Sequence, residues 1–365
     1  MLDPAFARQR QSRLLQQMQT LEIDAVVVGW SQHVYYFTAY RPFWLQEAAF
    51  LLSSDGRSTA FVAGKTPLAP AADDLIEFQG SWDGTQRQDQ PAAVAALVLD
   101  QLKGRKIKRL ALDASAVSSQ ILLQRQSVAT AADPVLWQMR RAKDPDELNL
   151  MRKAFACADA MYARARQIIE PGIDEIHLFA QLHEAAVRVA GEPLSAVLGN
   201  DYSCGAGGGP PRGGKQARAG EIYILDVGPA YRGYFADASR GLAVNGNPTD
   251  AQRKAHAALV GCFPIVERLA RPGVRCTDVY RAVDEHLKST AGAGLTHHLG
   301  HGIGLQPHEF PHLNLRWDDV FIEGEVFTVE PGLYGPQLGG GIRLENTYAI
   351  KSTGLENLVT APLDL

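Results

Sequence analysis

The chain has 365 residues, of which 46% are hydrophobic and 21% charged. This composition is that of an ordinary globular protein and excludes a disordered or collagen-like chain, while the length allows one to three domains. Lys and Arg number 36 against 40 Asp and Glu, a net charge of −4. The chain therefore lacks the basic excess that favours binding to nucleic acid.

The residue pattern gives no sign of export or of a membrane anchor. The first residues carry no basic segment followed by an apolar one, so we expect no signal peptide. No apolar run reaches the ~18 residues that a membrane-spanning helix needs. Four scattered cysteines form no Cys-x-x-Cys pair, which argues against a disulfide framework or a thiolate zinc site. We therefore expect a cytoplasmic protein with reduced thiols.

Residues 1–138 alternate between strand-like and helix-like stretches. Short apolar runs at 25–28 and 109–112 predict strands, and those at 49–52 and 59–62 flank a Ser-Ser-Asp-Gly turn and predict a hairpin. The Ala- and Leu-rich residues 92–102 predict a helix. This alternation is typical of an α/β domain.

A second domain is expected to comprise residues 139–365. Asp144 suits the N-cap of a helix, Pro145 its first position, and Glu147 completes a capping-box pattern. A long helix should follow and stop by Pro171-Gly172.

This second domain contains a weak internal repeat. Pro171-Gly172 opens a helical segment that ends at Ala190-Gly191, and Pro272-Gly273 opens another that ends at Ala291-Gly292. The offset is 101 residues at both ends. Such punctuation is common by chance, but the spacing predicts two α/β halves related by a pseudo-twofold axis.

Each half should contain a hairpin with two acidic residues. A turn centred on Tyr231-Arg232 would place Asp226 directly across from Asp237, with Cβ atoms about 4.5–5.5 Å apart. Carboxylates so placed repel each other unless a cation lies between them.

The second hairpin repeats this pattern. A loop centred near Gln337-Leu338 would place Glu330 across from Glu345. The four carboxylates would converge if the two halves face each other.

Histidines gather in one segment of the second half. Five of the ten lie between positions 297 and 312, and Gly300, Gly302 and Gly304 there allow close approach of the backbone. One imidazole among four carboxylates is an oxygen-rich set that suits a pair of Mn²⁺, Co²⁺ or Zn²⁺ ions. Each residue alone has a plain structural explanation as a cap, a turn or a hydrogen-bonded group, so the inference depends on their conjunction.

These motifs resemble those of the pita-bread metallohydrolases, which include methionine aminopeptidase, aminopeptidase P, prolidase and creatinase. Asp226 and Asp237 match Asp-x10-Asp, His301 matches Gly-His-Gly-Ile-Gly, Glu330 matches Glu-Pro-Gly-x-Tyr, and Glu345 matches Arg-x-Glu-Asn-Thr. The resemblance implies that these five residues bind two divalent ions, bridged by Asp237 and Glu345. Manganese is the expected metal, with cobalt or zinc as alternatives.

Further matches point to the prolidase branch. The motif at residues 34–40 and the basic linker at 139–152 resemble the creatinase/prolidase N-domain and its connection. The implied fold is α/β (α+β), with an N-terminal creatinase/prolidase-like domain, residues 1–138, before a catalytic pita-bread domain, residues 139–365. The implied protein is a homodimer that acts on small peptides.

The same resemblance implies the roles of single residues. Glu330 would exchange protons with the attacking water and the leaving nitrogen, and His308 would stabilise the tetrahedral oxyanion. His297 and Arg343 would position the substrate. The expected reaction is hydrolysis of the amide bond before proline in a dipeptide or short peptide.

One departure from the family pattern keeps other functions open. Gly208, 18 residues before Asp226, lies where the family usually carries a histidine, and residues 200–214 contain none. Arg212 or Tyr202 could take its place. The alternatives are a creatinase-like C–N hydrolase or lyase acting on a small zwitterion, and a non-catalytic binding protein on the same fold.

Overall fold

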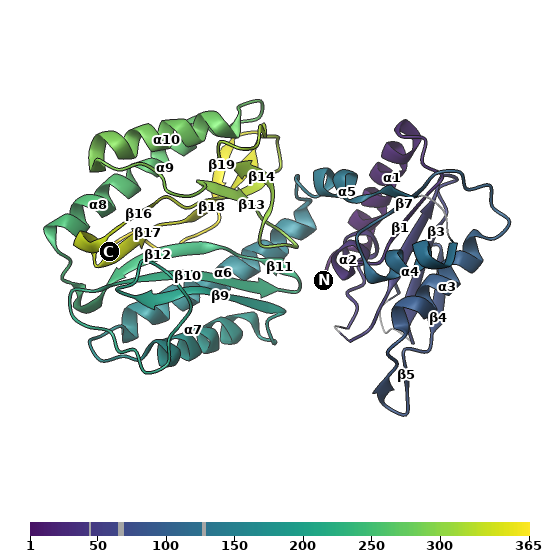
Figure 1. Cartoon of the computed structure of the whole chain (residues 1–365), viewed down its shortest axis with the longest axis horizontal. Coiled ribbons are helices and arrows are strands. Elements are labelled where there is room, and N and C mark those ends of the chain that lie inside the picture. The colour runs from purple at the N-terminus through teal and green to yellow at the C-terminus, as the bar shows by residue number, and fades with distance from the viewer. Residues whose placement is uncertain (44, 65–68, 126–128) are drawn as a thin grey trace. The chain divides into compact units, whose positions relative to one another are not determined.

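The computed structural model of the chain describes residues 1–43, 45–64, 69–125 and 129–365. It divides into two compact units, Met1–Arg140 and Arg141–Leu365 (Figure 1). Each unit has a core of buried apolar side chains of its own. In the described part of the chain, no helix combines the length and apolar character needed to cross a membrane.

The first unit is built on a mixed six-stranded sheet with the order β4-β3-β2-β1-β7-β8. Its strands are β1 (Ala25–Val28), β2 (Ala49–Ser53), β3 (Ser58–Ala63), β4 (Asp74–Phe78), β7 (Leu110–Leu112) and β8 (Thr130–Ala131), besides the hairpin of β5 (Ser81–Trp82) and β6 (Thr85–Gln86). Its helices are α1 (Pro4–Thr20), α2 (Ser31–Thr38), α3 (Gln90–Leu102), α4 (Ala116–Arg125) and α5 (Asp133–Met139). The predicted hairpin is confirmed, since β2 and β3 pair antiparallel around the Ser-Ser-Asp-Gly turn.

The second unit contains two larger sheets and five α-helices. The helices are α6 (Pro145–Ile168), α7 (Glu175–Ala190), α8 (Asp250–Val260), α9 (Cys262–Leu269) and α10 (Cys276–Ala291), with short 3-10 turns η1 (Val244–Gly246) and η2 (Pro336–Leu338). The strands of the first sheet are β9 (Ala196–Cys204), β10 (Ile222–Tyr231), β11 (Tyr234–Phe235) and β12 (Ala238–Ala243). Those of the second are β13 (Gly300–Gly302), β14 (Glu309–Leu313), β15 (Val326–Val329), β18 (Asn346–Lys351) and β19 (Gly354–Asn357), and β16 (Gly332–Gly335) pairs with β17 (Gly340–Arg343).

The predicted repeat is present as two α/β halves. Helices α7 and α10 both have 16 residues, and their bounds differ by 101 positions at each end. Both end at a glycine in the left-handed region, Gly191 and Gly292, each with φ of 73°. Within this unit, α6 and α7 lie on one side of the strands and α8, α9 and α10 on the other (Figure 1). The helix predicted after the linker also forms, and it starts with the Asp144–Glu147 capping box.

The register of the first acidic hairpin differs from the prediction. Its turn is centred on Arg232 and Gly233, whose φ angles of 48° and 92° are the positive values that a two-residue hairpin turn requires. Asp226 therefore pairs with Ser239, and Asp237 lies two residues nearer the turn. The prediction that the two carboxylates lie directly opposite each other is wrong, because a shift of the turn by one residue displaces the partner by two.

The second hairpin has the predicted register. Gly332 pairs with Arg343 and Gly335 with Gly340, around a loop centred on η2. A β-bridge between Ser239 and Glu345 then connects this hairpin to β12 of the first half. This bridge is what brings the acidic ends of the two halves together.

Candidate metal centre

The five residues selected as metal ligands lie together in the second unit. Asp226 belongs to β10, Asp237 precedes β12, His301 is the central residue of β13, Glu330 follows β15, and Glu345 follows β17. Ligand atoms of Asp237, His301 and Glu345 all lie within 4.8 Å of one another. The Nε2 atom of His301 is 3.4 Å from Glu330 Oε1 and 3.9 Å from Asp237 Oδ2.

Two glycines explain how His301 reaches this position. A Cβ atom on Gly300 would lie 1.9 Å from the carbonyl oxygen of Thr328, and one on Gly302 would lie 1.8 Å from that of Phe310. Only glycine therefore allows β13 to fit between its neighbours β14 and β15. The Nδ1 atom of His301 lies 3.0 Å from the carbonyl oxygen of Gly302, which leaves Nε2 facing the carboxylates.

The buried carboxylates of this cluster favour the binding of cations. Burial, and after it the charges of neighbouring carboxylates, hold the pKa values of Asp226, Asp237 and Glu345 well above the ordinary range. The Oε2 atom of Glu345 is buried and has no hydrogen-bond partner in the described part of the chain. Buried carboxylates that repel one another and leave an oxygen unpartnered fit a divalent cation centre.

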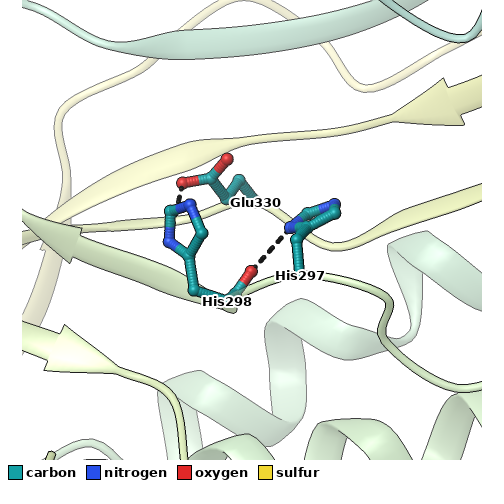
Figure 2. Close-up of side chains that lie close together, drawn as sticks. All are labelled: His297, His298 and Glu330. Carbon is teal, nitrogen blue, oxygen red and sulfur yellow. Dashed lines mark hydrogen bonds and ion pairs between the residues drawn. The ribbon is translucent and has the colours of Figure 1, made fainter. Parts of the chain in front are cut away.

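Two adjacent histidines near Glu330 have different partners (Figure 2). The Nδ1 atom of His298 lies 3.6 Å from Glu330 Oε1. His297 instead lies with Nε2 2.9 Å from the hydroxyl of Tyr334 and Nδ1 2.7 Å from the carbonyl oxygen of His298. Ligand atoms of His297, His298 and Glu330 all lie within 4.8 Å of one another. Sequence reasoning selected His297 and missed His298, because nothing in the sequence of this loop shows that both neighbouring side chains face the site.

His308 also lies at the centre. Its ring stacks on that of His301, with centroids 3.7 Å apart and planes 13° from parallel. Burial, with the charge of His301, lowers the pKa of His308 to about 4, so the ring is neutral at neutral pH. Its neighbour Glu309 accepts hydrogen bonds from Lys143 Nζ at 3.3 Å and from the backbone of Gln306 at 2.9 Å. These contacts anchor the segment that carries His308.

Arg343 lies between two carboxylates. Its Nη2 donates to Asp226 Oδ2 at 2.6 Å and also to Asp201 Oδ2, and its Nη1 donates to the Tyr334 hydroxyl at 3.3 Å. Asp201 lies on β9 directly across from Asp226. Sequence reasoning missed Asp201 because residues 200–214 resembled a loop, whereas the strand extends to Cys204.

The two residues considered as replacements for the absent loop histidine have other surroundings. Arg212 ion-pairs with the buried carboxylate of Glu175 at 2.6 Å and donates to the carbonyl oxygen of Cys204. Tyr202 is buried against the ring of Phe179. Its hydroxyl has no hydrogen-bond partner within the described residues.

Comparison with known families agrees with this geometry. Residues 149–352 match the model of metallopeptidase family M24, and residues 10–141 match that of the creatinase/prolidase N-terminal domain. The chain belongs to metallopeptidase family M24. The family is one of metallopeptidases. The resemblance inferred from the motifs is thereby confirmed for both parts of the chain.

Among curated M24 relatives, the probable dipeptidase PepE of Mycobacterium tuberculosis is 31% identical over 242 residues, which cover 64% of this chain and 62% of the relative. The Xaa-Pro dipeptidase of Pyrococcus furiosus is 29% identical over 237 residues, 64% of this chain and 67% of that one. The match to the mycobacterial relative thus spans less than two thirds of its length.

Solved structures share the fold over nearly the whole chain. The Xaa-Pro dipeptidase from Bacillus anthracis has a TM-score of 0.83 and 21% identity, covering 98% of this chain and 99% of that one. The prolidase from Pyrococcus furiosus has a TM-score of 0.78 and 22% identity, covering 95% and 99%. The predicted fold, a creatinase-type N-domain before a pita-bread domain, is confirmed.

Proposed function

We propose that this protein hydrolyses the amide bond before proline in a dipeptide or short peptide, with two divalent metal ions as cofactors. The observation that carries the proposal is the convergence of Asp237, His301 and Glu345 within 4.8 Å. Membership in family M24 and similarity to a named Xaa-Pro dipeptidase support it. We assign the N-terminal domain to residues 1–138 and the catalytic domain to residues 139–365.

In this proposal Asp226, Asp237, His301, Glu330 and Glu345 hold the metal ions. When bound, the ions would act as Lewis acids on the scissile carbonyl and lower the pKa of water. We favour manganese, with cobalt or zinc as alternatives, because four of the five ligands are carboxylates.

The protein residues would then orient the reactants and move the protons. Glu330 takes the proton of the attacking water on its carboxylate and passes it to the leaving nitrogen. His308, neutral at the pH of the reaction, donates a hydrogen bond to the oxyanion of the tetrahedral intermediate. Arg343 and His297 hold the substrate, His297 together with the Tyr334 hydroxyl 2.9 Å away.

We also propose a cytoplasmic location, a homodimeric state and a small peptide substrate. All four cysteines are free and buried, which suits a cytoplasmic protein. The likeness to prolidases suggests a homodimer and a small peptide substrate. Size-exclusion chromatography with light scattering measures the oligomeric state directly.

A second candidate is a non-peptidase reaction, the cleavage of a C–N bond in a small zwitterion. The glycines at 207–209, which stand in place of the usual histidine, favour it because a different loop implies a different leaving group. A rate screen with Mn²⁺ across Xaa-Pro dipeptides, Xaa-Pro tripeptides and creatine-like amides separates the two candidates.

The assignment of the centre is tested with Glu330→Ala. We expect turnover to fall by orders of magnitude while the far-UV circular dichroism spectrum is unchanged. Glu267→Ala is the matched control, since Glu267 accepts a hydrogen bond from Tyr348 outside the proposed ligand set. A Glu330 variant with the normal rate would refute the role of this carboxylate.

A further inference from the structure

We infer that Asp201 determines substrate specificity by matching the charge of Arg343, so that the enzyme prefers a prolyl residue without a free carboxylate. The expected substrates are prolyl amides or peptides that continue beyond the proline, rather than Xaa-Pro dipeptides. This inference rests on the proposed function and narrows its substrate class.

The position of Asp201 follows from the sheet. Asp201 on β9 is the direct cross-strand partner of Asp226 on β10, so the two side chains share one face. The guanidinium of Arg343 donates from Nη2 to both carboxylates, at 2.6 Å in the case of Asp226. Arg343 therefore has two acidic partners, although one would balance its charge.

The loop after β9 is packed onto Asp201. The backbone N–H of Gly209 donates to Asp201 Oδ1. A Cβ atom on Gly208 would lie 3.0 Å from the same oxygen, and one on Gly207 would lie 2.9 Å from the carbonyl oxygen of Gly340. The backbone of Gly209 thus contacts Asp201, and the three glycines at 207–209 bring no side chain to the site.

The charge of Arg343, which is proposed to hold the substrate, is then matched without a substrate carboxylate. Two divalent ions would offset Asp226, Asp237, Glu330 and Glu345. Among the other charged side chains, Lys143 lies 3.3 Å from Glu309 and Arg343 contacts Asp201. The buried guanidinium of Arg240 donates to the backbone oxygen of Glu345 and to Asn346 Oδ1 at 3.0 Å.

In a bound Xaa-Pro dipeptide, the free carboxylate of the prolyl residue would lie close to these charged groups. Its carbon is joined through one atom to the scissile nitrogen, a separation of about 2.5 Å from standard bond lengths and angles. A dipeptide therefore brings an unmatched negative charge into a partly buried site, which is unfavourable. An amide or a further residue at this position removes that charge and keeps the rest of the substrate.

The test uses the full-length protein with Mn²⁺ and a matched pair of substrates, Ala-Pro and Ala-Pro-amide. We expect the wild type to cleave the amide with at least about tenfold higher kcat/KM, the effect of one partly screened charge. Asp201→Asn and Asp201→Ser should each lower this amide-to-acid ratio about tenfold, because Arg343 then has an unmatched charge. Glu192→Gln, which removes a surface partner of Arg232, should leave the ratio unchanged.

Three results would overturn the inference: a wild type that prefers the free acid, equal rates for the pair, or both Asp201 variants with the wild-type ratio. If neither substrate is cleaved, the proposed function fails, and calorimetric binding of L-proline and L-prolinamide to the Mn²⁺-loaded protein decides the charge argument alone. Tighter binding of prolinamide to the wild type, reduced in the Asp201 variants, would support it, and equal binding would refute it.

Discussion

Replacing Gly302 by alanine tests how the chain places His301, the proposed histidine ligand. A Cβ atom at this position would lie 1.8 Å from the carbonyl oxygen of Phe310 and 2.3 Å from its carbonyl carbon. These are backbone atoms of a paired strand, so no rotamer change relieves the overlap. Overpacking costs about 1–3 kcal/mol where side chains can move. We therefore expect a loss of about 3 kcal/mol or more in the free energy of unfolding of the metal-free protein.

The measurement is urea denaturation in the presence of a chelator, together with calorimetric titration of Mn²⁺. For a unit of this size, about 3 kcal/mol corresponds to a fall in Tm of about 6–12 °C. Metal affinity should fall as well, because His301 is the next residue in β13. Gly213→Ala is the control, since its Cβ would meet only Ile176 Cγ1 at 3.9 Å. A Gly302→Ala variant within about 0.5 kcal/mol of the wild type would refute the argument from close packing.

Three further predictions concern charge. Metal analysis should find up to two divalent ions per chain, and full activity in metal-free protein would contradict the proposed centre. The raised pKa values of Asp226, Asp237 and Glu345 mean that the folded metal-free protein binds protons more tightly than the unfolded chain. Its free energy of unfolding should therefore fall as the pH rises above about 4, by about 1.4 kcal/mol per unit of raised pKa. Glu345→Gln should flatten this dependence in thermal melts across pH, and an unchanged slope would refute the assignment. Lys143→Met should lower the free energy of unfolding by about 3–5 kcal/mol in chemical denaturation, because Glu309 loses the ammonium beside it. Lys143→Arg keeps the positive charge and should lose less, so a smaller loss in Lys143→Met than in Lys143→Arg would contradict this prediction.

Local sequence signals predicted much of the fold. The capping box of Asp144 and Glu147, and the glycines that end α7 and α10, act within a few residues and are readable from the sequence. The register of the first hairpin was mispredicted because it depends on which two residues adopt positive φ. The observed turn places Arg232 and Gly233 in that conformation, whereas the predicted turn lay one residue earlier, at Tyr231 and Arg232.

The residues of the candidate site also divide into those that the sequence predicted and those that only the structure revealed. Family motifs selected Asp226, Asp237, His301, Glu330 and Glu345 by residue type and spacing, because close backbone approach and metal chemistry both restrict which amino acids are usable. The sequence alone thus determined the class of fold, the family resemblance and the expected kind of chemistry through these local restrictions. Only the tertiary structure decided that Asp201 lies across from Asp226 and contacts Arg343, and that His298 lies beside Glu330 together with His297. These contacts join segments distant in sequence or depend on side-chain direction in a loop, and neither property leaves a periodic pattern in the chain.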